Sequence, residues 1–371
     1  MKPTTELPAD PALPGIEAIR TLGLARAIPQ LEVEEGPVEI RLVGYTPGAR
    51  ATLEAHVGLR HLAIKLYAYD PAPEAELYEA LARAGLAGHA GPRVPPLLAR
   101  QHDLRILVIG WLEGPTVHEL VKVGKGARAG QLAADWMRCA AALPLGLGPK
   151  LGSARVLYRA GEWVAALVAA DPGLGKTAKA LARVLANTQP REQAPRLLHG
   201  TFYARHVLEL GDGPGVIDWE RYGQGPCELD AGMFLATTWR LGLDHPALVA
   251  DAARAEQALL AGTEGLLDER ALAWHRAAAL LRLAAKVRVV ERRKPDWLAR
   301  AEAQLREAMR LAERAGQPEP VEQRAAAPAS AFKLNGAALQ LILRALATRP
   351  ATPEELERIR RLLDETRDRP S

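Results

Sequence analysis

The fold is decided by two neighbouring stretches of the sequence, His199-Gly200-Thr201-Phe202-Tyr203-Ala204-Arg205-His206 and Ile217-Asp218-Trp219-Glu220. Between them, Val207–Leu210 and Val216–Trp219 are predicted to form two short strands, because the turn Gly211-Asp212-Gly213-Pro214-Gly215 that joins them is a strong hairpin signal. An Asp at the end of a strand, directly after a hairpin, is well placed to hold Mg²⁺, which takes carboxylate oxygens together with phosphates and water. The sequence therefore predicts a metal-binding role for Asp218.

Upstream of these stretches the sequence predicts a small antiparallel sheet. Val38–Val43 and Ala51–His56 alternate apolar and polar residues, which is typical of half-buried strands. His61–Tyr67 and Arg105–Trp111 supply two further strands. Pro73–Ala84 is predicted to form a helix, because proline stands at its start and a glycine follows its end.

Lys65 lies in the middle of one of these apolar strands, where a lone ammonium group would be costly to bury. Glu76 and Glu79 on the next predicted helix are the available partners, and the pattern does not choose between them. A strand lysine held by a helix glutamate and aimed at nucleotide phosphates is the arrangement found in kinases. The alternative is a lysine on the exposed face of an edge strand.

Downstream the pattern becomes mainly helical. Apolar residues recur at helical spacing in seven segments: Gln131–Leu143, Glu162–Ala170, Thr177–Ala186, Glu228–Leu241, Pro246–Ala261, Glu269–Arg292 and Trp297–Ala315. Gly316–Ser330 has the composition of a linker. Two last helices are predicted at Gly336–Ala347 and Pro353–Asp368, and an apolar face of the first could dock on the chain itself or on a partner protein.

The stretch Gly173-Leu174-Gly175-Lys176-Thr177 ends like a phosphate-binding P-loop. The P-loop pattern also needs a glycine five positions before Gly175, and Ala170 stands there. A P-loop follows a strand, whereas this stretch follows a predicted helix. We therefore interpret it as the end of one helix and the start of the next.

The order of the parts resembles that of the aminoglycoside phosphotransferase and choline kinase-like enzymes, which have a protein kinase-like fold. Their catalytic loop, His-Gly-Asp-x-x-x-x-Asn, is followed by a hairpin and Ile-Asp-[Trp/Phe/Leu]-[Glu/Asp], and this chain is similar over residues 38 to 310. The resemblance implies an α+β bilobal fold with a small antiparallel-sheet N-lobe and a larger helical C-lobe. It further implies that ATP and Mg²⁺ are the cofactors. Lys65, with Glu76 or Glu79, would then bind the nucleotide, and Asp218 would bind the metal. Asp230 would anchor the backbone of the catalytic loop.

Two residues depart from the family pattern. Thr201 stands at the position of the catalytic Asp, and His206 stands at the position of the metal-binding Asn. A threonine cannot accept the proton of an acceptor hydroxyl at neutral pH, and a positioned base is worth about 10²–10⁴ in rate. Imidazole is a poor ligand for Mg²⁺, so His206 is a doubtful metal ligand. His199 is expected to be a packed loop residue more than a base, and the sequence does not decide whether Glu220 faces a substrate or solvent.

The expected domain organisation follows from these parts. Residues 1–34 form an N-terminal lead, 35–112 the nucleotide-side N-lobe, and 113–316 the helical C-lobe with the catalytic-loop region at 197–220. Residues 317–371 are assigned to the linker and the C-terminal helices.

Composition limits the partners and the compartment. The 371 residues carry a net charge of +4 without a long basic run, which speaks against nucleic acid. The N-terminal residues lack the apolar core of a signal peptide, and no window is apolar enough for a membrane span. Two cysteines cannot build a disulfide framework, so we expect a cytoplasmic protein.

Three functions remain open at this point. The first is a kinase-fold protein that binds ATP but is impaired in catalysis at positions 201 and 206. The second is an active ATP-dependent phosphotransferase on a small hydroxylated, amino-sugar or choline-like acceptor. The third is a protein-interaction module that reuses the fold through its C-terminal helices.

Overall fold

The computed structural model describes residues 7–32, 38–290 (side chains up to 286) and 296–317. These residues all belong to one compact unit, Met1–Gln317. The helices predicted at 336–347 and 353–368 lie outside the described residues. Within the described part, every helix is too short or too polar to cross a membrane.

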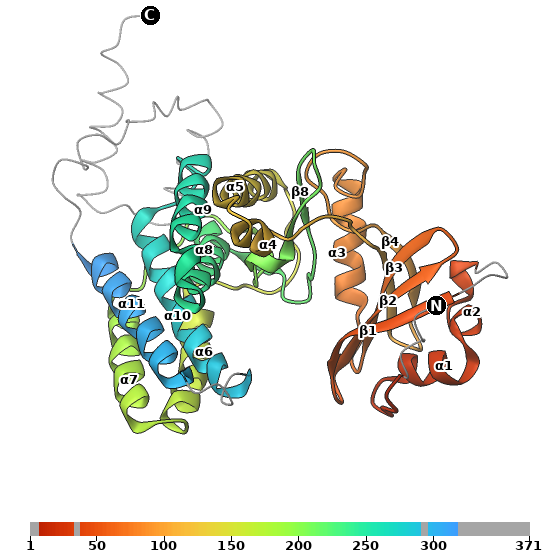
Figure 1. Cartoon of the computed structure of the whole chain (residues 1–371), viewed down its shortest axis with the longest axis horizontal. Helices are drawn as coiled ribbons and strands as arrows, with labels where there is room; N and C mark the ends of the chain where they lie inside the picture. The colour runs from red at the N-terminus through yellow and green to blue at the C-terminus, as the bar shows by residue number, and fades with distance from the viewer. Residues whose placement is uncertain (1–6, 33–37, 291–295, 318–371) are drawn as a thin grey trace, which may run out of the picture. The chain divides into compact units, whose positions relative to one another are not determined.

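A five-stranded antiparallel sheet forms the N-terminal lobe, with strand order β1-β2-β3-β5-β4 (Figure 1). Its strands are β1 (Val38–Thr46), β2 (Arg50–Val57), β3 (Arg60–Tyr67), β4 (Leu97–Gln101) and β5 (Ile106–Gly110). The four strands predicted for this part of the chain, at 38–43, 51–56, 61–67 and 105–111, are confirmed as β1, β2, β3 and β5. Strand β4 was not predicted, because it is only five residues long, lacks an alternating pattern and directly follows a proline-rich stretch.

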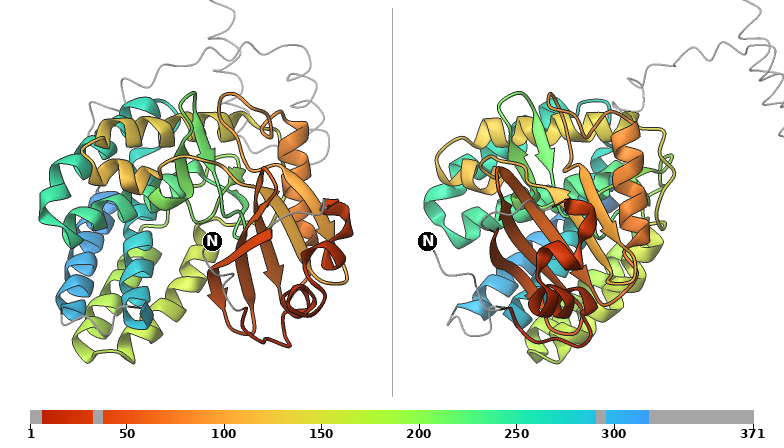
Figure 2. Two further views of the ribbon diagram at one scale, coloured as in Figure 1. Left: turned by 45° about the vertical axis from the view of Figure 1, so that its right-hand side comes forward. Right: turned by 90° about the vertical axis from the view of Figure 1, so that its right-hand side faces the viewer.

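The two faces of this sheet have different neighbours. Helices α1 (Pro14–Leu22) and α2 (Leu24–Ala27), with the 3₁₀ turn η1 (Pro29–Leu31), pack on the face that carries Leu53 and Ile64 (Figure 2). Lys65 and Thr52 are paired across β2 and β3 and point to the opposite face. Helix α3 (Ala72–Arg83) lies on that second face, close to the residues predicted to bind nucleotide.

The C-terminal lobe is mainly helical (Figure 1). Its helices are α4 (Val117–Lys122), α5 (Gly126–Ala142), α6 (Ser153–Val168), α7 (Pro172–Asn187), α8 (Cys227–Asp244), η3 (Pro246–Leu248), α9 (Val249–Gly262), α10 (Glu269–Val290) and α11 (Trp297–Gly316). The Gly-Lys-Thr stretch lies in the first turns of α7, where the Asp171 side chain caps the helix by accepting the Leu174 N–H. Its interpretation as a helix start is confirmed.

Two small ladders hold the loop region between the helices. The hairpin consists of β7 (Val207–Glu209) and β8 (Pro214–Val216), and the 3₁₀ turn η2 (Ala204–His206) precedes it. The second strand ends at Val216, so the prediction that it extends to Trp219 is wrong, and Asp218 lies in a loop. A further pair, β6 (Arg196–Leu198) with β9 (Gly223–Gly225), closes this loop at its base.

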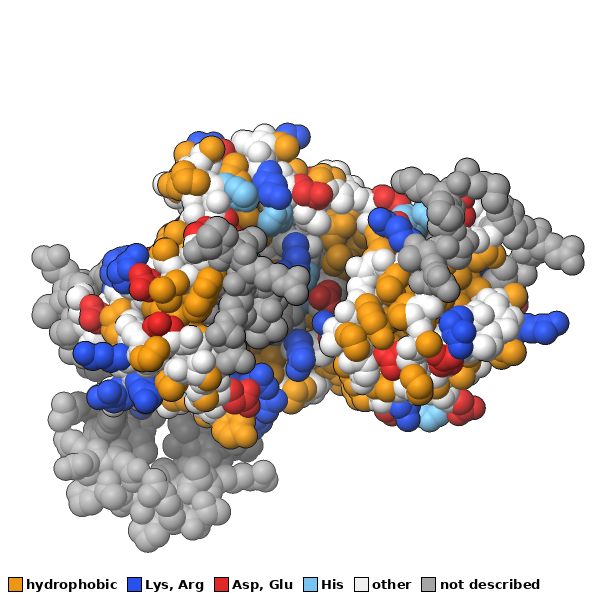
Figure 3. Space-filling model, turned by 60° about the horizontal axis from the view of Figure 1, so that its bottom comes forward, with side chains coloured by type: hydrophobic (Ala, Val, Ile, Leu, Met, Phe, Trp, Pro, Cys, Tyr) orange, Lys and Arg blue, Asp and Glu red, His pale blue; other side chains and the backbone are white. Residues whose placement is uncertain are grey.

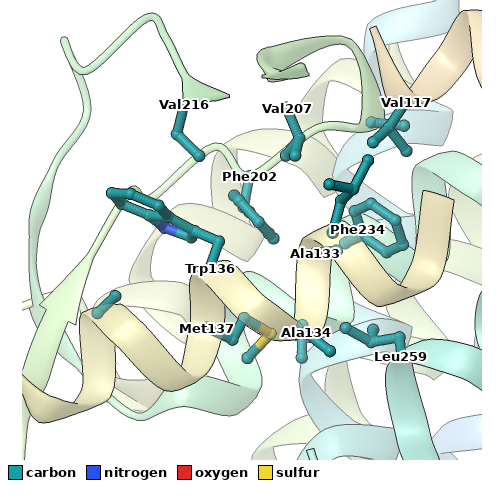
Figure 4. Packing of buried hydrophobic residues seen from close by; sticks show 14 of the residues in the cluster. Val117, Ala133, Ala134, Trp136, Met137, Phe202, Val207, Val216, Phe234 and Leu259 are labelled. Carbon is teal, nitrogen blue, oxygen red and sulfur yellow. The ribbon is translucent and has the colours of Figure 1, made fainter. Parts of the chain in front are cut away.

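The catalytic-loop region is fastened to the main hydrophobic core. Phe202 is fully buried and packs with Trp136, Val207, Val216 and Phe234, which come from α5, the hairpin and α8 (Figure 4). Aromatic side chains bury large apolar areas and dominate the energetics of such cores. The loop is therefore part of the core of the C-terminal lobe.

We expect Phe202→Ala to lower the free energy of unfolding by about 3–5 kcal/mol, because it removes a buried aromatic ring and leaves a cavity. Tyr158→Ala is the matched control, since Tyr158 is 75% exposed and its loss should change stability by less than about 0.5 kcal/mol. Urea unfolding of both variants measures the difference. Equal stabilities of the two variants would contradict the burial of Phe202 in the core.

Candidate active site

The catalytic-loop region is anchored by one buried carboxylate. Asp230, in the first turn of α8, accepts the His199 N–H at 2.6 Å and the Gly200 N–H at 2.9 Å. Burial raises the pKa of Asp230 to about 7. The two N–H donors favour the ionised carboxylate and oppose this effect, but burial outweighs them. This is the anchoring role that the family resemblance implies for Asp230.

The turn at Gly200 admits only glycine. Its φ is +74°, and a Cβ at this position would lie 2.0 Å from the carbonyl oxygen of Arg221. A side chain is excluded by both the backbone conformation and the close neighbour. The turn thereby aims Thr201 toward the space between the lobes.

His199 has a structural position. Its Nε2–H donates to the Ile217 carbonyl at 2.8 Å, and its Nδ1 accepts the Thr201 N–H at 3.3 Å. The ring is 1% exposed, and burial lowers its pKa to about 4. A base this weak and this buried is ill suited to accept a proton from an acceptor, which agrees with the expectation that it is a packed loop residue.

His206 and Asp218 lie side by side. The His206 Nδ1–H donates to the Thr201 carbonyl at 2.9 Å, and its Nε2 lies 3.1 Å from Asp218 Oδ2. Burial lowers the pKa of His206 to about 3, and in the neutral form of the ring the Nε2 that faces Asp218 carries a lone pair. Burial alone would raise the pKa of the Asp218 carboxyl, but nearby basic side chains, His206 and Lys65 foremost, lower it below its ordinary value.

This pair is a suitable place for a divalent ion. A neutral imidazole nitrogen and a carboxylate oxygen are both acceptors, and they attract each other only through a proton or a cation between them. Asp218 also has a positive φ of 69°, an uncommon backbone conformation that is concentrated at functional sites. The donor set therefore fits one ion held through the Asp218 carboxylate, with an imidazole nitrogen beside it.

Lys65 is buried and its partner is Glu74. The Lys65 ammonium pairs with Glu74 Oε1, and the Tyr67 hydroxyl donates to Glu74 Oε2 at 2.7 Å. Both charged side chains are less than a tenth exposed. Since an unpaired buried ammonium is costly, Glu74 fixes Lys65 on the sheet face that carries it.

The expectation that Glu76 or Glu79 partners Lys65 is therefore wrong. Both are exposed, and Glu79 lies 4.0 Å from Arg83 on its own helix. Glu74 shares the buried stripe of α3 with Tyr78 and Leu81, at the spacing of one helix face. That periodicity is readable in the sequence, because Glu74 stands four residues before Tyr78 and seven before Leu81.

Glu220 links the two lobes. Its carboxylate pairs with Arg50 at the start of β2, and its Oε1 lies 4.0 Å from Lys65 Nζ. The Glu220 side chain is 7% exposed. The question that the sequence left open is thus answered, because Glu220 faces the basic residues of the sheet and is not a solvent-facing group.

These residues open onto one cavity of about 510 Å³ between the sheet and the helices. Thr201, His206, Asp218 and Glu220 line it, together with residues of α6, α8 and α10. His199, Lys65 and Glu74 are not among the lining residues. The structure therefore brings Thr201, His206 and Asp218 to one cavity. Lys65 does not line this cavity, but its ammonium lies 4.0 Å from Glu220, which does.

A second group of ligand-type side chains lies on β2 and β3. The ligand atoms of Glu54, His56 and His61 lie within 4.8 Å of one another. The rings of His56 and His61 are stacked, with centroids 4.1 Å apart and an interplanar angle of 22°. The in-plane nitrogens of two stacked rings do not converge on one ion, so we do not assign a metal centre here.

We expect Glu74→Gln to lower the free energy of unfolding by roughly 3 kcal/mol, because it leaves the buried Lys65 ammonium without its full counter-charge. The matched control is Glu76→Gln on the exposed side of the same helix, which should leave stability unchanged within about 0.5 kcal/mol. Denaturant unfolding at pH 7 distinguishes the two. An equal effect of both substitutions would argue against the Lys65–Glu74 pair.

The profile described as the phosphotransferase enzyme family matches residues 57–266, which is more than half of the chain. No curated protein matches the sequence significantly.

Solved structures share the fold at low sequence identity. A thermostable mutant of aminoglycoside phosphotransferase APH(4)-Ia, in a ternary complex with AMP-PNP and hygromycin B, is 15% identical, with 79% of this chain and 99% of that chain covered and a TM-score of 0.55. A putative aminoglycoside phosphotransferase from Ralstonia eutropha is 17% identical, with coverages of 77% and 95% and a TM-score of 0.53. A choline/ethanolamine kinase family protein from Mesorhizobium loti is 19% identical, with coverages of 79% and 93% and a TM-score of 0.51.

The five-stranded sheet lobe, the helical lobe and the anchored loop between them are the parts that a kinase-like fold requires. Taken with the profile match over more than half of the chain, they make this chain a member of the phosphotransferase enzyme family, with a protein kinase-like fold.

Proposed function

We propose that this chain binds a nucleoside triphosphate with a divalent ion between its lobes, and that it is impaired in phosphoryl transfer by the usual base-assisted route. One observation carries the second half of this proposal. The carboxylates that line the cavity are Glu162, Asp218 and Glu220. Glu162 pairs with Arg159 at 3.0 Å, Glu220 pairs with Arg50, and Asp218 contacts His206.

None of these carboxylates is placed as the base for an acceptor hydroxyl, because two are paired with arginine and Asp218 is the proposed metal ligand. Thr201 occupies the position from which the family's catalytic Asp would act, and its hydroxyl lies 3.4 Å from His199 Nδ1. A hydroxyl group is not a base at neutral pH. The loss of a positioned base lowers the rate by about 10²–10⁴.

The nucleotide half of the proposal rests on the groups that are retained. Lys65 is held by Glu74 in the arrangement by which kinases position a lysine for nucleotide phosphates. On the same sheet face, the His61 ring stacks between the rings of His56 and Trp111, and the half-buried Trp111 ring, with its centroid 4.4 Å from that of His61, is the aromatic surface proposed for a nucleobase. Some solved relatives contain nucleotides, AMP-PNP in one and GDP in another.

The proposed metal ligand is Asp218. A bound ion would supply positive charge to the nucleotide phosphates, and Mg²⁺ is commonly held by one or two carboxylates together with those phosphates and water. His206 adds a nitrogen donor beside Asp218, where the family pattern has an amide oxygen. Nitrogen donors suit Mn²⁺ better than Mg²⁺, so we propose that Mn²⁺ supports nucleotide binding at least as well as Mg²⁺.

A working phosphotransferase is the second candidate. Phosphoryl transfer depends mostly on positioning and on electrostatic stabilisation, so the retained Lys65 and Asp218 favour some residual activity toward a small hydroxylated acceptor. A role for the C-terminal helices in binding a protein partner, the cytoplasmic location and the absence of a nucleic-acid or membrane partner remain predictions from the sequence.

Titration calorimetry with ATP and either Mg²⁺ or Mn²⁺ tests the nucleotide site. We expect metal-dependent binding that Asp218→Ala abolishes, because the substitution removes the proposed metal ligand. Glu119→Ala is the control, since Glu119 caps α4 away from the cavity and should leave binding unchanged. Absence of binding at millimolar ATP with both metals would contradict the proposal.

A double variant tests the impairment. Thr201→Asp with His206→Asn restores the base and the amide ligand of the family pattern, and we expect it to raise ATP turnover by roughly 10²–10⁴ over the parent. The assay is release of ADP, in the presence of candidate acceptors and in their absence. A parent that turns over as fast as the double variant would favour the second candidate function.

A further inference from the structure

The cavity beside Thr201 has a strong excess of basic side chains. Seven Arg and Lys residues line it, against three Asp and Glu residues. Two of the basic side chains have a carboxylate partner, as in the Arg50–Glu220 and Arg159–Glu162 pairs. In a space-filling view, basic side chains are visible around the central hollow (Figure 3).

The other five basic side chains have no carboxylate within ion-pair distance in the described part of the chain. These are Arg155, Arg205, Arg221, Arg282 and Lys286. Among the residues that the structure describes, no acidic group therefore cancels their positive charge by direct pairing.

Tyr203 lies among these cations. Lys286 Nζ donates to the Tyr203 hydroxyl at 3.0 Å, and the Arg205 guanidinium lies 4.6 Å from the centre of its ring. Burial would raise the pKa of Tyr203, but Arg282 and Lys286 outweigh burial and lower the pKa below its ordinary value. The pKa of Arg282 is lowered as well, first by burial and then by the neighbouring charges of Arg221 and Arg159. Both shifts have the sign expected in a positive field.

The charge of the cavity selects its ligand. Aminoglycosides and choline are cations, and a site that receives them needs carboxylates or aromatic faces, whereas five uncompensated cations repel them. Arginine side chains form bidentate hydrogen bonds with phosphate and carboxylate groups. Arg282 on α10 and Arg155 on α6 reach the cavity from helices outside the catalytic loop.

We propose that this cavity binds an anionic hydroxylated compound, one that carries a phosphate or carboxylate group, with its anionic group on Arg282 and Lys286 and its remainder toward Thr201. The assignment of this compound as the acceptor rests on the proposed function. Its binding does not, because the cations are present without nucleotide.

The test uses the full chain and three probes of similar size and different charge. Glycerol 3-phosphate is the anion, glycerol the neutral compound and choline the cation. We expect calorimetry at low salt to show binding of glycerol 3-phosphate alone, weakening as salt is added. Tighter binding of choline or equal binding of glycerol would overturn the proposal.

Variants locate the bound anion. Arg282→Gln should weaken glycerol 3-phosphate binding about tenfold, and Lys286→Gln several-fold, since each removes a charged donor. Lys286 is exposed, so its substitution leaves a measurement even where Arg282→Gln fails to fold. Arg306→Gln on α11 is the control, because its side chain is 70% exposed and its nearest acidic partner is Glu302. Equal binding by all four proteins would overturn the assignment to these residues.

A nucleotide arm separates the two sources of phosphate. With ADP and Mn²⁺ at saturation, persistence of glycerol 3-phosphate binding supports a separate acceptor site. Complete competition, with Arg282→Gln weakening ADP binding as well, would mean that these cations serve the nucleotide phosphates and would overturn the acceptor assignment. Failure of ATP to bind at all would contradict the proposed function and leave the anion measurement intact.

Discussion

The site depends on two hydrogen bonds, in which the Asp230 carboxylate accepts the backbone N–H groups of His199 and Gly200. The carboxylate lies 31 residues downstream of His199 in sequence, on a helix that is itself part of the core. Its two oxygens fix consecutive peptide groups at the sharp turn of Gly200, and the following residues take their direction from that turn. Position 201 is thus presented to the cavity by the backbone, whatever side chain it carries. This explains how the chemistry of the loop can change while its geometry is kept.

The interior of the cleft has two electrostatic regions. Near the sheet, Lys65 and Arg50 are balanced by Glu74 and Glu220, and the Arg50–Glu220 pair joins the sheet to the loop after the hairpin. Near α10, Arg282 lies among like charges without such a balance. Pairing in the first region fixes geometry, since buried charges demand partners. In the region near α10, the excess positive charge favours the binding of a negatively charged ligand.

Much of the fold was predictable because its signals are local. Strands with one buried face alternate apolar and polar residues, and helices end at proline and glycine, so β2, β3 and α3 follow from patterning. The pairs β4–β5 and β6–β9 were not predicted in full, because three to five residues carry little pattern and their partners are set by tertiary contacts.

The site was predictable where a motif named it and less so elsewhere. His199, Thr201, His206 and Asp218 stand in two neighbouring motifs, and the structure brings the last three to one cavity. Glu74 was missed although its periodicity was present. The positive charge of the cavity was not readable, because Arg155, Arg205 and Arg282 are far apart in sequence and meet only in the folded chain.

The left-handed backbone of Asp218 has a consequence for how this family member could evolve. A non-glycine residue in a sparsely populated conformation costs of order 1–3 kcal/mol, which a glycine at the same place would recover. Stability selection alone would therefore favour losing the carboxylate, and only a benefit from the carboxylate opposes that drift. At Asp218, the residue type that would give the highest stability differs from the one that can bind an ion. Such a conflict between stability and function is found in other proteins.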